Sequence, residues 1–202
     1  MHHLTQFSEG KINHIGLSEV SSTTLRRAYK IAPVAAVQME YSPFTRDIEG
    51  ETGKNILATC RELGVAVVCY SPLGRGLLTG DFSSKDAISG DGRAAQFPRF
   101  SEDNLEANAR VVEHFKKFAD KKKCTPSQLA IAWLLKQGND IFPIPGTKRT
   151  AKLDENWAAL QVDLSDDDEA EIRAFVEKNE MAGYRSTLAG RSSAFVDTKE
   201  EQ

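Results

Sequence analysis

The chain has 202 residues, of which 40% are hydrophobic and 27% are charged, so it can bury a substantial core and is neither disordered nor fibrous. A net charge of -3 gives no overall attraction to nucleic acid or to an anionic membrane surface, so neither is expected as a partner. No segment approaches the ~20 apolar residues of a membrane helix, and the three cysteines lack metal-ligand spacing, which favours a cytoplasmic protein without a metal site.

Short apolar runs alternate with longer amphipathic stretches along the chain. The runs have the pattern of parallel strands buried on both faces, and they lie at residues 14–18, 34–42, 65–73 and 140–146. Helices are predicted at residues 22–30, 47–63, 102–122, 126–136, 151–160 and 165–179. Three hydroxyl side chains are predicted to cap helices at their N-termini: Thr125, Thr150 and Ser165.

This order of strands and helices predicts an α/β fold with a parallel sheet. Two architectures compete, a doubly wound sheet and a (β/α)8 barrel of the TIM type. A barrel has eight strands over ~250 residues, so the four strands here resemble half of one. We expect a long loop over the strand ends between Gly74 and Ser101, one domain over residues 1–182, and a flexible tail at 183–202, which lacks periodicity.

Polar and aromatic residues lie toward the C-terminal ends of the first three runs or just after them, where a barrel keeps its site. Ser18 and Gln38 offer donors and acceptors that suit an amide, and Tyr70 offers a flat face for a planar heterocycle. Gly74 and Gly76 lack a Cβ, so backbone there can approach a pyrophosphate. Taken singly, each of these residues is better explained by a structural role, and the prediction depends on their joint placement.

The fourth run ends in a candidate phosphate site. Gly146 and Thr147 stand just before a predicted helix N-terminus, where backbone N–H groups favour anions. Lys148, Arg149 and Lys152 add positive charge. These cations could equally form a solvated helix face, so the prediction depends on their joint placement with the other strand ends.

Five ordered segments carry a family resemblance: KINHIGLSEVSSTTLRRA, AAVQMEYSPFTRDIE, CRELGVAVVCYSPLGRGLLTG, TPSQLAIAWLL and IFPIPGTKRTAKLDENWAAL. Together they resemble the second half of an aldo-keto reductase, a (β/α)8-barrel oxidoreductase that uses NADPH. The resemblance extends from about Leu4 to Asn179. It implies that residues 1–182 form the C-terminal half of such a barrel.

The resemblance also implies roles for individual residues. Ser18 and Gln38 would hold the nicotinamide carboxamide, and Tyr70 would stack on its ring. The remaining implied contacts are to the pyrophosphate (Ser71, Leu73, Gly74, Gly76), the 2'-phosphate (Gly146, Thr147, Lys148, Lys152, with Arg149 a less certain neighbour) and the adenine (Glu155, Asn156). Glu19 departs from the Asn of better-known branches. The extra cations favour NADPH over NADH, which would leave them unpaired.

No catalytic residue is predicted in this chain. The resemblance places the family's catalytic Tyr, Lys, Asp and His in the first half of the barrel, before the segment KINHIGLS. We therefore expect an NADP(H)-dependent reductase of aldehydes or ketones that is inactive as this chain alone. A non-catalytic NADP(H)-binding or regulatory half-barrel acting through protein interaction is the alternative, and an interaction role without ligand is a third reading. His2, His3 and His14 are predicted to be surface residues.

Half of a closed sheet leaves two strand edges unpaired, and such edges invite association. We therefore expect self-association through the open edges. Whether the chain is a natural short product or an incomplete gene model stays open, and so does the identity of the substrate.

Overall fold

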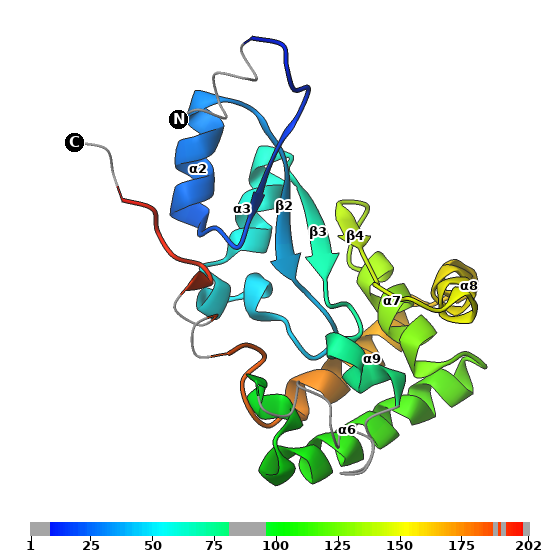
Figure 1. Ribbon diagram of the computed structural model, residues 1–202. Helices are drawn as coiled ribbons and strands as arrows, with labels where there is room; N and C mark the ends of the chain where they lie inside the picture. The colour runs from blue at the N-terminus through cyan, green and yellow to red at the C-terminus, as the bar shows by residue number, and fades with distance from the viewer. Residues whose placement is uncertain (1–8, 81–95, 188–189, 191–192, 200–202) are drawn as a thin grey trace.

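The computed structural model describes residues 9–80, 96–187, 190 and 193–199. Its centre is a four-stranded parallel sheet in the order β1-β2-β3-β4 (Figure 1). The strands are β1 (Ile15–Ser18), β2 (Val34–Glu40), β3 (Ala66–Tyr70) and β4 (Ile141–Pro143). The four predicted strands are confirmed, although each is shorter than its apolar run. Residues 81–95 of the predicted long loop, and His2 and His3, lie outside the described residues.

Helices follow the strands and cover one face of the sheet. They are α2 (Ser22–Ile31), α3 (Ile56–Leu63), α6 (Glu102–Lys121), α7 (Pro126–Lys136), α8 (Thr150–Ala158) and α9 (Asp166–Lys178). Short 3₁₀ turns are η1 (Asp47–Glu49), η2 (Glu51–Gly53), η3 (Gly74–Thr79), η4 (Pro98–Phe100) and η5 (Ala159–Gln161). Helices α2, α3 and α7 contact the strands, α8 lies on the β4 side, and α6 and α9 lie beyond the strand ends (Figure 1). No helix of the described chain is long and apolar enough to cross a membrane.

Alternation along the strands separates a buried face from an open one. Val37, Met39 and Cys69 are buried in the core, which also contains the fully buried Trp133 of α7. Successive side chains of a strand point to opposite faces, so the intervening residues face away from these helices. Phe142 of β4, one of them, is 51% exposed. The second face of the sheet is therefore largely uncovered.

Two of the three predicted helix caps are confirmed. The Thr125 hydroxyl accepts a hydrogen bond from the backbone N–H of Gln128, and the Thr125 N–H donates one to Oε1 of the Gln128 side chain. Ser165 forms the same reciprocal capping box with Asp168. The prediction for Thr150 is wrong, because Arg149 is the N-cap of α8 and Thr150 is already helical. The hydroxyl that stabilises the turn before α8 is instead that of Thr147, which accepts a hydrogen bond from the Arg149 N–H at 3.1 Å.

The predicted continuous helix at residues 47–63 is also wrong in its first half. This stretch forms η1 and η2 before α3 begins at Ile56. Gly53 packs so closely on η1 that a Cβ would lie 2.4 Å from the carbonyl oxygen of Asp47. Lys54 and Asn55 then adopt φ angles of 53°, in the left-handed region, which interrupts helical geometry. The predicted helix at residues 151–160 ends at Ala158 and continues as η5.

The described residues beyond 182, where a flexible tail was predicted, include side chains that pack on the rest of the chain. Arg185 and Phe195 are each 8% exposed, so both are buried against the domain. Val196 forms a parallel bridge with Val20, just beyond β1. This C-terminal segment (the described residues 183–187, 190 and 193–199) therefore packs along the β1 side of the sheet, where Figure 1 shows its last part in red.

Candidate functional site

The open face of the sheet carries polar side chains near the strand ends. Ser18 of β1 and Gln38 of β2 are register partners, and both are exposed. Glu40, two residues beyond Gln38, is the register partner of Tyr70 on β3. Because residues two apart on a strand share a face, the structure brings these four side chains to one face at neighbouring levels. Three of them were predicted together from the sequence.

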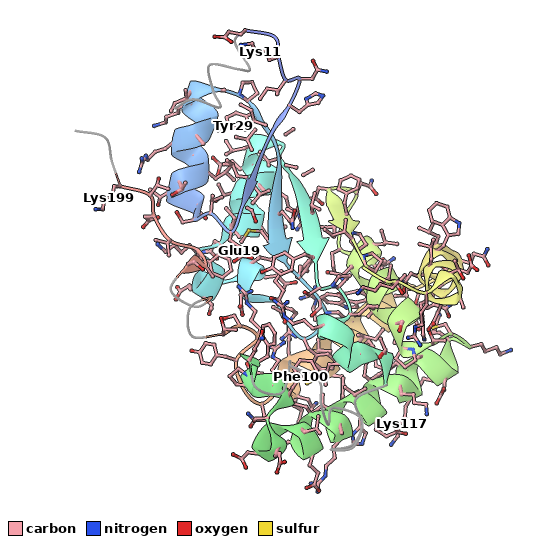
Figure 2. The ribbon with its side chains drawn as sticks, viewed as in Figure 1. Lys11, Glu19, Tyr29, Phe100, Lys117 and Lys199 are labelled. Atoms are coloured by element: carbon pink, nitrogen blue, oxygen red, sulfur yellow. The ribbon has the colours of Figure 1, made fainter. Side chains whose placement is uncertain are left out.

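Tyr70 is half-buried, and its hydroxyl is occupied. The phenol donates a hydrogen bond of 2.8 Å to Oε1 of Glu19, which Figure 2 shows just beyond β1. Burial raises the pKa of Tyr70, and the hydrogen bond from Tyr70 to Glu19 and the charge of Glu19 raise it further. The guanidinium of Arg75 lies 6.0 Å from the centroid of the Tyr70 ring. A planar group would therefore have to stack on the opposite side of this ring.

Glu19 reaches Tyr70 because the backbone turns sharply after β1. Its φ of 52° lies in the left-handed region, which is uncommon for a non-glycine residue and marks strain. The Glu19 N–H donates to the carbonyl of Gln38 at 3.1 Å, and the Glu40 N–H donates to its carboxylate at 3.3 Å. Glu19 thus joins the ends of β1, β2 and β3 through its backbone and its carboxylate.

A cavity of about 440 Å³ lies beside this face. Its lining includes Ser71, Leu73 and Gly76 from the loop after β3 and Gly146 from the loop after β4. The structure thereby brings together residues predicted from two separate motifs. Gly74 does not line the cavity but forms the turn next to it, with a φ of 57°. The N–H groups of Gly74 and Gly76 donate to Ser71 and Leu73 carbonyls, so these glycines contribute space and curvature, whereas their N–H donors are already used.

The cations after β4 differ in their exposure and in their ion-pair partners. Thr147, Lys148 and Arg149 are exposed, and Lys148 forms no ion pair with any described residue. Lys152 is ion-paired with Glu155 at 2.5 Å. Neither Thr147 nor Lys148 is among the described residues that line the cavity.

The two residues predicted to contact adenine are engaged within the fold. The Glu155 carboxylate accepts from the Thr125 hydroxyl at 2.8 Å, which fastens α8 to the start of α7. Burial would raise the pKa of Glu155, but the hydrogen bonds from Lys152 and Thr125 outweigh it and lower that pKa. Asn156 is 7% exposed.

Sequence reasoning missed three charged residues at this site. Arg75 lines the cavity and is ion-paired with the buried Glu40 at 3.3 Å, and Arg185 is ion-paired with Glu40 at 2.9 Å. A signal existed for Arg75, which stands between Gly74 and Gly76, and for Glu40, a carboxylate inside an apolar run. Arg185 had no local signal, because its partners are more than a hundred residues away in sequence.

A model of the aldo/keto reductase family matches residues 1–177 of the chain. The chain belongs to the aldo-keto reductase family. It is 46% identical over 190 residues to the aldo-keto reductase yakc [NADP(+)] of Schizosaccharomyces pombe, covering 94% of this chain and 55% of that protein. It is 43% identical over 192 residues to the aldo-keto reductase str7 of Strobilurus tenacellus, covering 95% and 56%. The chain spans about half the length of these relatives.

Solved structures support the same assignment. The glycerol dehydrogenase of Gluconobacter oxydans superposes with a TM-score of 0.76 at 25% identity, over 88% of this chain and 53% of that one. The predicted family and the predicted half of a parallel TIM-type barrel are therefore confirmed. The roles of individual cofactor residues in this aldo-keto reductase chain stay predictions.

Proposed function

We propose that the chain forms the NADP(H)-binding half of an aldo-keto reductase that reduces an aldehyde or ketone to an alcohol. One observation carries the proposal. Ser18, Gln38 and Tyr70 share the open face at the strand ends, next to a cavity lined by Ser71 and Gly146. The S. pombe relative is named as an NADP(+) enzyme, in agreement with this cofactor class.

The side chains suit the successive parts of a dinucleotide. Ser18 and Gln38 are exposed neighbours that offer a hydroxyl and an amide, which match the donor and the acceptor of a carboxamide. The ring of Tyr70 offers a stacking surface with its hydroxyl held away by Glu19. The cavity lined by Ser71, Leu73 and Gly76, which follow Tyr70 in the chain, would receive the pyrophosphate. When bound, NADPH supplies the hydride, and these residues hold and orient it.

The exposed Lys148 favours a cofactor with an additional phosphate. Its ammonium is available to an incoming anion, whereas that of Lys152 must be shared with Glu155. A cation without a partner gains more from the 2'-phosphate of NADPH than from the neutral hydroxyl of NADH. Discrimination between the two cofactors is therefore proposed to depend mainly on this segment after β4.

Carbonyl reduction also needs a proton donor, and Tyr70 is unsuited to that task. Burial raises the pKa of its phenol, which already donates to Glu19. By family resemblance, a Tyr tuned by Lys and Asp, with a His beside it, would face this sheet from the first half of the barrel. We infer that this chain binds cofactor and that turnover requires those groups.

A titration of NADPH against the purified chain tests the proposal. Nicotinamide fluorescence should change and saturate, while an added aromatic aldehyde should cause no loss of NADPH absorbance. Mixing the chain with a separately expressed first half of a related barrel should restore NADPH oxidation. An unchanged fluorescence signal up to millimolar NADPH would reject the cofactor-binding function.

A non-catalytic role through protein interaction has separate support. Phe142 and Ile144 on or after β4 are 51% and 46% exposed, and α8 and η5 expose Leu153, Trp157 and Leu160. Apolar surface of this kind is a site for association with another half-barrel or a second copy of the chain. NADPH binding without any turnover in the mixture with the first half would favour this regulatory alternative.

A further inference from the structure

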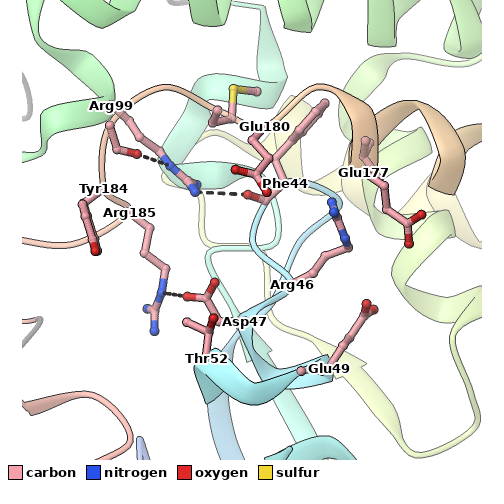
Figure 3. Close-up of a pocket in the computed structure, with 14 residues that line it drawn as sticks. Phe44, Arg46, Asp47, Glu49, Thr52, Arg99, Glu177, Glu180, Tyr184 and Arg185 are labelled. Atoms are coloured by element: carbon pink, nitrogen blue, oxygen red, sulfur yellow. Dashed lines mark hydrogen bonds and ion pairs between the residues drawn. The ribbon is translucent and has the colours of Figure 1, made fainter. Parts of the chain in front are cut away.

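Arg185 of the C-terminal segment lies at the centre of a buried cluster of charges. Its Nε lies 2.8 Å from Oδ2 of Asp47, and its two terminal nitrogens lie 2.9 Å from Oε2 of Glu40 and 3.6 Å from Oε2 of Glu19. The side chain is only 7% exposed. Figure 3 shows Arg185 meeting Asp47 beside a cavity of about 670 Å³. One guanidinium therefore gathers carboxylates from three different segments.

The carboxylates around Arg185 stabilise the charged form of its guanidinium. Burial alone would lower the pKa of Arg185, but Glu40, Asp47 and Glu19 outweigh burial and raise it. Glu40 is 2% exposed and has a second cation, Arg75, at 3.3 Å. Removal of Arg185 would take away the cation in direct contact with all three carboxylates. It would leave Arg75, paired with Glu40, and Arg99, which acts on Glu40 and Asp47 through its charge. Repulsion between the carboxylates would then move Glu19 and Glu40 apart.

The same carboxylates set the position of Tyr70. Glu19 accepts the phenol hydrogen bond at 2.8 Å, and a terminal nitrogen of Arg185 lies 3.5 Å from the phenol oxygen. Arg75, which is paired with Glu40, lies 6.0 Å from the ring centroid. The tip and one side of the ring are thus held by groups that Arg185 organises.

The C-terminal segment reaches Glu19 a second time through its backbone. The N–H of Phe195 donates to the carbonyl of Glu19 at 3.1 Å, and Val196 forms its bridge with Val20. Asp197 then pairs with Lys54 at 2.8 Å. Docking of this one segment therefore fixes both the main chain and the side chain of the residue that holds Tyr70.

We propose that Arg185 is a positioning residue that couples docking of the C-terminal segment to the orientation of the Tyr70 ring. The inference rests on the proposed function, because Tyr70 matters to cofactor only as a stacking surface for nicotinamide. By this proposal, Arg185 affects binding of the nicotinamide end of the dinucleotide. The adenosine 2'-phosphate end lies by proposal on the segment after β4, whereas the polar partners of Arg185 among the described residues are Glu19, Glu40, Asp47 and Tyr70.

Binding of two ligands to an Arg185→Lys variant tests the coupling. Lysine keeps the charge, but one ammonium cannot span three carboxylates as the planar guanidinium does. NADPH contains the nicotinamide, and adenosine 2',5'-bisphosphate lacks it. We expect NADPH affinity to fall about 10-fold and bisphosphate affinity to change less than 2-fold. The matched control is Arg173→Lys, another partly buried arginine with three carboxylates, Glu49, Glu169 and Glu177, which should leave both affinities unchanged.

Tyr70→Phe provides a second route to the same answer, because it removes the tethered hydroxyl and keeps the ring. We expect this variant to lose NADPH affinity, and Arg185→Lys to cause little further loss in the double variant, since both changes release the same ring. Equal losses for both ligands, or fully additive losses in the double variant, would overturn the coupling and leave Arg185 a stabiliser of the fold. Failure of the unmodified chain to bind either ligand would instead overturn the proposed function.

Discussion

Replacement of both Lys148 and Lys152 by methionine should weaken NADPH binding and leave NADH binding nearly unchanged. The two lysines differ in the structure, and so do their expected contributions. Lys148 is exposed and has no ion-pair partner among the described residues, so it meets a phosphate as a solvated charge. Lys152 is 29% exposed but already contacts Glu155 at 2.5 Å, so it meets the phosphate as a shared charge.

These environments set the magnitude of the effect. An exposed ion pair contributes about 0.5 to 1 kcal/mol, which we assign to Lys148. A charge-assisted hydrogen bond contributes ~1.5 to 3 kcal/mol, but the contact of Lys152 with Glu155 leaves about 1 kcal/mol of that for the phosphate. The sum of about 1.5 to 2 kcal/mol corresponds to a roughly 10- to 30-fold increase in the Kd for NADPH.

Parallel fluorescence titrations with NADPH and NADH measure this difference directly. The control is Lys178→Met, which removes an exposed lysine from the last turn of α9 and should alter neither Kd. Raising the salt concentration should reduce the preference for NADPH, because exposed charges are screened. Equal losses of NADPH and NADH affinity in the double variant would refute the assignment of these lysines to the 2'-phosphate.

Two further predictions concern stability and association. Asp168→Ala should cost about 1 kcal/mol in urea unfolding at pH 7, because it removes the side-chain half of the capping box at Ser165 and the ion pair with Lys122. Hydrogen bonding from Lys122, and then from Ser165, lowers the pKa of Asp168 from 3.8 to about 2, so the deficit should be full above pH 3.8 and vanish as the pH falls through 2; a deficit independent of pH would contradict this. Replacement of Phe142 and Ile144 by serine should raise the Kd of self-association at least 10-fold in sedimentation equilibrium, since each half-exposed side chain offers about 1 kcal/mol of burial. An unchanged Kd would exclude this face from the contact.

Local chemistry determined which parts of the fold could be predicted. The bounds of α7 were predicted correctly because Thr125, a hydroxyl residue directly before the helical stretch, is a local N-cap signal, and it does cap this helix. Residues 47–63 were predicted wrongly because the helix is interrupted by a tertiary contact, the close packing of Gly53 on Asp47. No periodicity in the sequence reports such a contact.

The same distinction applies to the candidate site. Ser18, Gln38 and Tyr70 could be grouped in advance because parallel strands in register bring their ends to one edge. The ion pair of Lys152 with Glu155 and the burial of Arg185 could not, because both depend on side-chain partners selected by packing. Sequence therefore predicted which backbone positions meet, and the structure was needed to say which charges remain available.

The location of these residues gives the open face two competing uses. Ser18 and Gln38, proposed for the nicotinamide, lie on the face that also exposes Phe142. In a closed barrel, such a face is filled by inward side chains, while the ligand occupies only the strand ends. A second copy that covered Phe142 would approach the same strand ends, whereas a complementary half-barrel would leave them accessible. Self-association and cofactor binding should therefore oppose each other, so NADPH should shift the chain toward monomer by mass action.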